Sequence, residues 1–387
     1  MNRKMAFLIF FSIVLLIYTS VNYYIFVRGM QALPAGSLIK TLFPWVFWGL
    51  AATYIIGRTL EKIFLSQASD FFVWTGSFWL AAMLYFFLAV VLLDLVRLIQ
   101  HFIPLLPSFV MDHYEKAKLW VFSGTVLSVI VLIVAGHINT LYPRVNKIDI
   151  HIAKQASGMQ QLNAVMLSDI HLGTIIGNGH FSRIVDQVQS LQPDIILLAG
   201  DILDEDLEPV LRQNIGETLR RLHAPLGVYG VMGNHEYIGG AEPAYEYLKS
   251  HGLTMLRDSV VKINNGFYIA GREDRDKSRF AGRTRKPLEQ LAQQTDTSFP
   301  VILIDHQPYY LEEAAELGFD LQLSGHTHHG QLWPLNLVTS AIFTLSRGYK
   351  KIGSMHAVVS NGVGTWGPPV RIGNRPEIIQ LNITFGP

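Results

Sequence analysis

The residues best suited to chemistry lie late in the chain, in the stretch Gly325-His326-Thr327-His328. Two histidines one residue apart, after the apolar run 321–323, have the spacing of metal ligands in a loop beyond a β-strand. Alone, such a pair is more often a surface or packing feature. Four further polar clusters stand in the same context, each after an apolar run that predicts a strand. They are Ser168-Asp169-Ile170-His171, Gly200-Asp201-Ile202-Leu203-Asp204, Gly233-Asn234-His235-Glu236 and Asp305-His306.

The elements that must position these clusters are short apolar strands alternating with helices. Strands are predicted at 145–152, 162–167, 195–199, 227–232, 260–263, 267–270, 301–304, 321–323, 355–359 and 377–383. Helices are predicted at 181–191, 210–222, 243–251 and 310–317. This order predicts an α/β sandwich. Ligands bind outside the carboxyl ends of strands in open α/β sheets, so the predicted fold and the predicted site support each other.

The first 142 residues have a different character, with uncharged runs at 5–27, 41–57, 71–93 and 119–141. A membrane-spanning helix needs about 20 apolar residues, with about 17 as the lower bound. We therefore predict four transmembrane helices. A cleaved signal peptide is the alternative for the first run, but its apolar core is too long and no small-residue cleavage site is evident. The predicted organisation is a transmembrane anchor at 1–142, a linker and lead-in strand at 143–162, and a catalytic domain at 163–387.

Membrane orientation is predicted from Lys and Arg in the short loops. With the N-terminus inside, the inner segments hold Arg3, Lys4, Arg58, Lys62, Arg144, Lys147 and Lys154, and the outer ones Arg28, Lys40, Arg97, Lys116 and Lys118. This bias predicts a multi-pass protein of the cell membrane with both termini and the catalytic domain in the cytoplasm. A C-terminal tag accessible from outside intact cells would reverse the assignment.

Composition narrows the chemistry of the site. The formal net charge is +1, which indicates no nucleic-acid partner, and the absence of cysteine excludes disulfides and thiolate ligands. Asp, Asn and His ligands suit Mn, Fe, Co or Zn. The seven candidates are too many for one ion that must keep open positions, so they indicate two metals with a shared carboxylate. They are Asp169, His171, Asp201, Asn234, His306, His326 and His328.

Together the five clusters resemble the ordered motifs of the calcineurin-like metallophosphoesterases, from about Leu162 to the C-terminus. The closing stretch 362–371 also resembles the bacterial membrane-associated branch of that superfamily. One departure is His329, where these relatives usually have glycine. His329 could crowd the loop or contact substrate, and we do not assign it as a metal ligand.

The resemblance implies a division of labour. One divalent metal ion would take Asp169, His171, Asp201 and His328, and the other would share Asp201 and add Asn234, His306 and His326. A bridging hydroxide would attack phosphorus in line. His235 would act as a catalytic residue that neutralises the phosphoryl group or protonates the leaving oxygen, and Asp204 would orient His235.

Simpler interpretations stay open for two of these residues. Asp204 lies in the acidic run 204–208, which could be a solvated loop, and Asn234 after Gly233 could simply tolerate a left-handed turn. At the level of function, the alternative to a phosphoesterase is a membrane protein that binds a nucleotide or phospholipid without turnover. A transporter is a weaker alternative, because the predicted spans hold few polar residues at mid-depth.

The stretch 332–345 after the histidine pair is apolar, includes Trp333, and is followed by Arg347, Tyr349, Lys350 and Lys351. This composition is typical of an interfacial segment, and it predicts a phosphorylated lipid or lipid-linked nucleotide as substrate. A helix packed into the domain core is the alternative. The resemblance favours a lipid, since a related branch cleaves a lipid-linked pyrophosphate in lipid A synthesis. Monoester, diester and pyrophosphate substrates all remain open.

Overall fold

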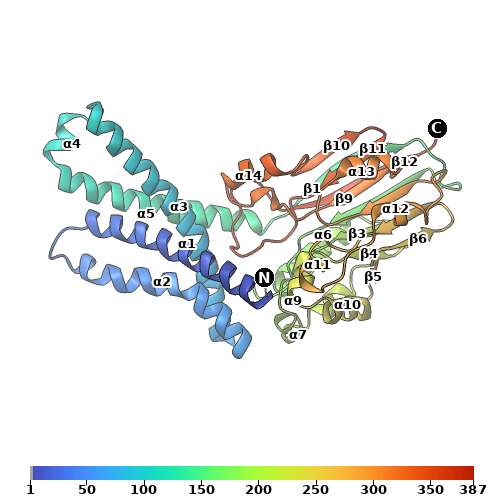
Figure 1. The fold of residues 1–387 in the computed structure, drawn as a ribbon, viewed down its shortest axis with the longest axis horizontal. Coiled ribbons are helices and arrows are strands. Elements are labelled where there is room, and N and C mark those ends of the chain that lie inside the picture. Colours follow the sequence, from blue (N-terminus) through green and yellow to red (C-terminus); the bar gives the residue numbers. More distant parts are fainter. Residues whose placement is uncertain (1–2) are drawn as a thin grey trace. The chain divides into compact units, whose positions relative to one another are not determined.

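A computed structural model describes residues 3–387 and divides the chain into two compact units, Met1–Gly136 and His137–Pro387 (Figure 1). The fourth long helix, α5 (Tyr114–Thr140), begins in the first unit, and its last turn belongs to the second. The anchor boundary predicted after residue 142 thus lies inside the second unit.

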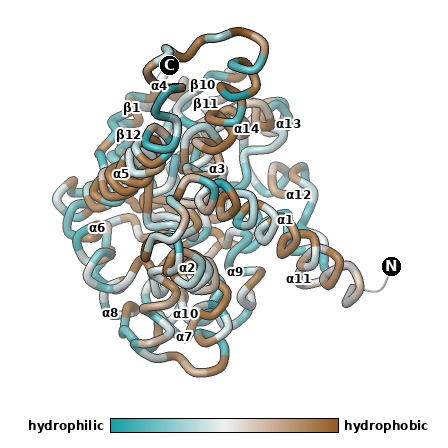
Figure 2. Tube along the Cα trace, turned by 90° about the vertical axis from the view of Figure 1, so that its left-hand side faces the viewer, coloured by the Kyte–Doolittle hydropathy of each residue, from teal (hydrophilic) through white to brown (hydrophobic). Residues whose placement is uncertain are grey.

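The first unit consists of helices. They are α1 (Arg3–Ala32), α2 (Leu38–Ile63), α3 (Gln67–Phe102), the short α4 (Ser108–Asp112) and most of α5. The four long ones are long and apolar enough to cross a membrane, which confirms the predicted number of candidate spans. Hydrophobic residues, brown in Figure 2, run along α5. The observed helices are longer than the uncharged runs in the sequence, because polar residues at the ends of the runs are also helical. Helix α3, for example, begins at a capping box in which the Ser66 side chain accepts a hydrogen bond from the Ser69 amide.

Polar side chains within the first unit are paired with one another. Asn22 is fully buried and accepts a hydrogen bond of 3.0 Å from the Trp79 indole. The Asp94 carboxylate forms an ion pair of 2.7 Å with the Arg28 guanidinium and accepts a hydrogen bond of 2.5 Å from the Tyr24 hydroxyl. Because an unpaired charge is costly in an apolar surrounding, these contacts join α1 to α3 at defined positions.

The second unit contains two six-stranded sheets. The first has the order β1-β12-β2-β3-β4-β5 and the second the order β10-β11-β9-β8-β7-β6. The strands of the first sheet are β1 (Arg144–Ile152), β2 (Gln161–Leu167), β3 (Ile195–Ala199), β4 (Val228–Val231), β5 (Thr254–Met255) and β12 (Glu377–Phe385). Those of the second are β6 (Ser259–Ile263), β7 (Phe267–Gly271), β8 (Val301–Ile304), β9 (Leu321–Ser324), β10 (Gly348–Ile352) and β11 (Met355–Val359). Strands β2, β3 and β4 run parallel, as do β8 and β9, so within each sheet their carboxyl ends meet at one edge.

Successive side chains of the central strands point to opposite faces of the sheet, and this alternation explains the layers of the domain. In β3, Ile195 and Leu197 pack into the core between the sheets, whereas Ile196 and Leu198 pack into a second core under the helices. Both faces are therefore covered, and every residue of β3 is buried. Helices α6 (Asn178–Ser190), α7 (Glu208–Arg212), α8 (Ile215–Leu219), α9 (Asn234–Gly239) and α10 (Ala241–Ser250) contribute to the layer over the first sheet. Helices α12 (Leu288–Ala292) and α13 (Leu311–Glu316) cover the second, and α11 (Lys277–Phe280) is a short connection. This arrangement confirms the predicted α/β sandwich.

The structure differs from the sequence prediction at several points. The helix predicted at 210–222 is the pair α7 and α8, separated by Asn214 in a left-handed conformation with φ of 51°. Strands β5 and β10 were not predicted. The apolar stretch after the histidine pair forms η1 (His328–Gly330) and α14 (Leu335–Ile342), and no residue of α14 is buried. The alternative of a core-packed helix is therefore wrong.

Candidate metal centre

Five loops at the carboxyl ends of strands carry all nine predicted site residues. Strands β2, β3 and β4 of one sheet and β8 and β9 of the other each end within three residues of a candidate ligand. The parallel direction within each sheet brings the loops together. The structure places these nine side chains in one connected cluster: Asp169, His171, Asp201, Asp204, Asn234, His235, His306, His326 and His328.

One group consists of Asp169, His171 and His328, whose ligand atoms all lie within 4.8 Å of one another. The Nε2 atoms of the two histidines face each other at 3.0 Å, and His328 Nε2 lies 3.6 Å from Asp169 Oδ1. All three side chains are buried. Two imidazole nitrogens and a carboxylate oxygen that converge on one point form a suitable ligand set for a divalent cation.

A second group consists of Asp201, His306 and His326, joined by the Asn234 amide. His306 Nε2 lies 3.1 Å from Asp201 Oδ2 and 3.2 Å from Asn234 Oδ1. His326 contributes its other nitrogen, Nδ1, at 2.8 Å from the same amide oxygen. The two histidines of the Gly-His-Thr-His stretch therefore serve different groups, which the spacing of one residue allows.

Asp201 connects the two groups. Its Oδ2 atom is 3.1 Å from His306 Nε2 and 3.8 Å from His171 Nε2, and its Oδ1 atom accepts a 2.9 Å hydrogen bond from the His235 amide. A carboxylate placed between two ligand sets has the geometry of a bridging ligand. Gly233 permits this approach, because a Cβ there would meet Asp201 Oδ1 at 2.1 Å.

The ligand loops hold an unfavourable backbone conformation. Positive φ angles of 45° to 72° occur at Asp169, His171, Asp201, His326 and His328. The left-handed region is uncommon for residues other than glycine, and such positions cluster at functional sites. Five of the seven candidate ligands share it.

The electrostatics of the cluster also suit a bound cation. Burial lowers the pKa of His171 to about 4 and that of His326 to about 3, which keeps both rings in the neutral form that binds metals. Burial raises the pKa of Asp169 to about 6, and its Oδ2 atom has no hydrogen-bond partner among the described residues. At Asp201, burial favours the neutral form, but His306 and His235 outweigh it and hold the pKa well below its usual value. The buried Oδ2 atom of Asp169, which has no such hydrogen-bond partner, is energetically costly unless it binds a cation.

His235 lies beside the ligands, with its Nδ1 atom 3.2 Å from Asp204 Oδ1. Burial disfavours the charged ring, but Asp201 and Asp204 outweigh burial and raise the pKa of His235 to about 9. Asp204 is also 3.8 Å from His171, at Nδ1 rather than at the nitrogen that faces His328. His171, Asp204 and His235 form a third convergent group. We interpret it as an orienting contact behind the ligands, because His171 meets it with Nδ1, the ring nitrogen that does not face His328.

Sequence reasoning missed the residues that support the ligands from behind. Arg371 is fully buried and donates hydrogen bonds to the carbonyls of Gly364 at 2.7 Å and Asn361 at 2.8 Å, and its Nη2 atom lies 3.2 Å from His328 Nδ1. Asn374 donates to the His328 carbonyl at 3.0 Å. In the sequence, the closing stretch 362–371 indicates only a resemblance to a branch of the superfamily. Its structural role, holding the loop of a metal ligand, follows from contacts distant in sequence.

Two further residues have a clear place around the cluster. Glu236 accepts hydrogen bonds from the Leu203 and Gly233 amides and so joins two of the ligand loops. The exposed Trp366 ring lies edge-on to His235 with centroids 5.7 Å apart. His329 belongs to none of the convergent groups, and its Nδ1 atom lies 2.9 Å from the Ser346 hydroxyl. Its φ of 45° explains why glycine suits this position.

Comparisons with known proteins agree with this geometry. The family profile described as calcineurin-like phosphoesterase matches residues 162–330. An uncharacterized metallophosphoesterase from Aquifex aeolicus is 33% identical over 250 residues, covering 64% of this chain and 94% of that protein. A transmembrane protein with metallophosphoesterase domain from Danio rerio is 32% identical over 276 residues, covering 67% of this chain and 62% of the fish protein. An uncharacterized metallophosphoesterase from Campylobacter jejuni is 27% identical over 391 residues, covering 98% of this chain and 99% of its own. The last match includes the apolar helices.

Proposed function

The chain belongs to the calcineurin-like metallophosphoesterases, and from this premise we propose that it hydrolyses a phosphate ester at the surface of a membrane with the help of two divalent cations. The observation that carries the proposal is the position of Asp201, which belongs to one ligand group and lies 3.8 Å from His171 of the other. A single-ion site would not need a carboxylate between two sets of imidazoles.

In this proposal Asp169, His171, Asp201 and His328 hold one cation, and Asp201, Asn234, His306 and His326 hold the other. Bound cations there supply positive charge for the phosphoryl oxygens and lower the pKa of water. The oxygen and imidazole donors suit Mn, Fe, Zn or Co. The pKa of His306 is raised because Asp201 outweighs burial, so any proton on this ring would have to leave before the ring could hold a cation.

His235 has the position of an acid. Its ring is buried against Asp204, carries a proton at neutral pH, and lies 4.6 Å from the His171 ring, centroid to centroid. A protonated imidazole beside the ligands can donate to a phosphoryl or leaving oxygen. The Asp204 carboxylate lies beside Nδ1 and favours this orientation of the ring, which leaves Nε2 for the substrate. This pairing favours hydrolysis over the alternative of binding without turnover.

The experiment that tests the function uses the full chain purified in detergent. We expect an activated phosphate ester to be hydrolysed only with a divalent metal, to lose turnover on chelation and to regain it when Mn, Fe, Zn or Co is supplied. Metal analysis should find close to two ions per chain. A preparation that retains its metals but turns over none of a panel of monoesters, diesters and pyrophosphates would support the non-hydrolytic alternative.

The exposed surface of α14 favours a lipid-linked substrate. Leu337, Val338 and Ile342 are 64%, 55% and 57% exposed, which leaves a contiguous apolar face on an eight-residue helix. Just after the helix, the Phe343 ring lies 6.2 Å from that of His326, centroid to centroid. An apolar surface adjoining a metal ligand suits a substrate whose phosphate is attached to a hydrocarbon.

Contacts before α14 connect this surface with the end of a candidate span. Leu332 pairs with Ile372, and the Asn139 side chain, in the last turn of α5, donates to the carbonyls of Arg371 and Asn374 at 3.0 and 2.7 Å. The loop 371–374 thus contacts both the exit of α5 and the segment leading into α14. This proximity supports a substrate taken from the bilayer.

The double variant Leu337→Ser/Val338→Ser tests the lipid proposal. We expect kcat/KM for a long-chain lipid phosphate in mixed micelles to fall about 30-fold, because each of the two lost apolar contacts is worth on the order of 1 kcal/mol. Turnover of a small soluble ester should be unchanged. Leu211→Ser, at another exposed leucine on α7, is the matched control. Equal losses on both substrates would argue against a lipid-binding role for α14.

A further inference from the structure

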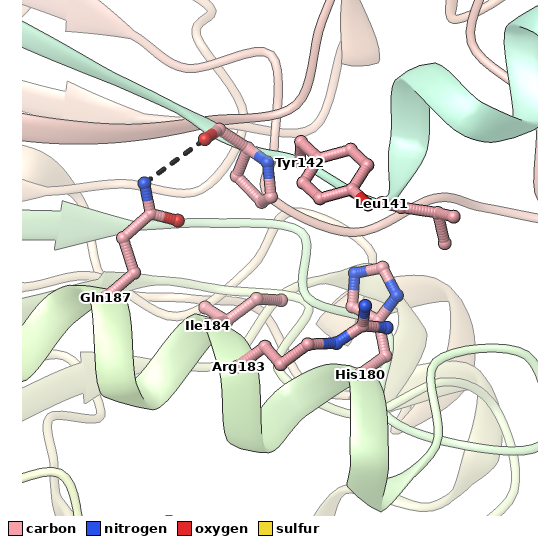
Figure 3. Close-up of a pocket in the computed structure, with 7 residues that line it drawn as sticks. Leu141, Tyr142, His180, Arg183, Ile184 and Gln187 are labelled. Carbon is pink, nitrogen blue, oxygen red and sulfur yellow. Dashed lines mark hydrogen bonds between the residues drawn. The ribbon is translucent and has the colours of Figure 1, made fainter.

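A second candidate site lies where the chain leaves its last candidate membrane span. A pocket of about 270 Å³ is lined by Leu141, Tyr142 and Pro143 on one side and by four residues of α6 on the other (Figure 3). These four are His180, Arg183, Ile184 and Gln187, which share one face of the helix at spacings of three and four residues. None of the seven lining residues belongs to the metal centre.

The pocket has a fixed wall. The Gln187 side chain donates a 3.2 Å hydrogen bond to the Pro143 carbonyl, shown dashed in Figure 3, which ties α6 to the segment after α5. Ile184 is buried and forms the apolar floor. Tyr142 is 68% exposed at the rim, two residues after the end of α5. An exposed tyrosine at the end of a candidate span is typical of the membrane–water interface.

The polar groups in the pocket are donors and cations. Arg183 is exposed and has no hydrogen-bond or ion-pair partner among residues 3–387. Beside it, burial lowers the pKa of His180 to about 4, and the positive charges of Arg183 and His137 add to that effect. No carboxylate lines the pocket. The nearest acid in sequence, Asp186, is engaged by Arg221.

Further basic residues adjoin the pocket. Arg144 directly follows Pro143 and is exposed, and its backbone amide donates to the carbonyl of Pro376, the residue after the exposed Arg375. Neither guanidinium has a partner in the part of the chain that the structure describes. Guanidinium groups without an ion-pair partner, next to a candidate span, are the arrangement that attracts anionic lipid headgroups.

We propose that this pocket binds a phosphate group of the kind carried by a phospholipid headgroup. Arg183 supplies the charge-assisted hydrogen bonds, and the neutral His180 ring and the Tyr142 hydroxyl supply further donors. The apolar residues Leu141 and Ile184 meet the uncharged part of the headgroup. The site holds lipid at the exit of α5 and acts independently of hydrolysis.

The test uses full-length protein in detergent micelles and native mass spectrometry with added phosphatidylglycerol. We expect Arg183→Gln to weaken retention of this lipid about tenfold or more, the effect of losing one charge-assisted contact. Arg183→Lys should retain most of the binding. Arg220→Gln, on the exposed end of α8, should match the wild type. Hydrolysis of a soluble ester should be the same in all four proteins, which checks folding.

Inorganic phosphate distinguishes the two sources of the anion. Displacement of phosphatidylglycerol by phosphate in the wild type would identify the phosphate group as the part that is bound. Phosphate binding that depends on Arg183, without retention of lipid, would assign the site to a soluble phosphate. Equal lipid retention in the wild type and Arg183→Gln, with no Arg183-dependent binding of phosphate, would overturn the proposal.

Discussion

Asp201→Asn is expected to reduce hydrolysis more than any other single substitution in the protein. The carboxylate lies between the two ligand groups, 3.1 Å from His306 and 3.8 Å from His171. The amide preserves the shape of the side chain but removes the one negative charge that both proposed cations would share. We expect a loss of more than about 10,000-fold in rate, which corresponds to more than about 5 kcal/mol of charge stabilisation.

Metal content separates this explanation from a folding defect. The purified variant should bind fewer than two ions per chain while keeping the circular dichroism spectrum of the wild type. Asp149→Asn is the control, because that carboxylate is exposed and accepts only a hydrogen bond from Asn382. A variant at Asp201 that keeps both ions and near-normal turnover would show that the carboxylate does not bridge.

His235→Ala is expected to lower turnover about 100- to 10,000-fold, the usual contribution of a positioned acid or base, with metal content unchanged. The reason is the separation of roles seen in the structure. The two groups assigned as ligands do not include His235, and its Nδ1 atom faces Asp204 instead. The assay is single-turnover hydrolysis of an alkyl phosphate ester, together with metal analysis on the same samples.

A substrate with a good leaving group sharpens the test. If His235 protonates the leaving oxygen, the variant should lose far less activity on a nitrophenyl ester than on an alkyl ester. His223→Ala, at an exposed histidine near the end of α8, is the matched control. Loss of metal from the His235 variant would make His235 a ligand and would invalidate the division of labour.

Much of the fold and the site could be predicted because both are encoded locally. Each central strand is a short run of apolar residues, and each run ends at a polar cluster. Asp169, Asp201 and His306 are therefore visible at strand ends in the sequence itself. Parallel strand order then brings them to one edge without any further information.

The rest depends on contacts distant in sequence. Residues 210–222 have helical spacing, but the Gln213 side chain bonds to the Gly173 carbonyl and the Asn178 amide, and the helix breaks at Asn214. Arg371 acts behind His328 across 43 positions. The apolar residues of α14 would suit a buried helix equally well, and only the tertiary structure shows that they are exposed.

The left-handed backbone at five candidate ligands has a consequence for how this domain can evolve. Each such residue costs on the order of 1–3 kcal/mol, against a total stability of only about 5–15 kcal/mol for a typical domain. Replacing Asp169 or His326 by glycine would relieve that cost but remove the candidate metal ligand. Selection for function therefore holds the domain below its greatest attainable stability. The packing of the two buried sheets must therefore supply the stability that offsets these strained loops. Mutational tolerance in strands such as β3 is therefore limited by the geometry of loops at their ends.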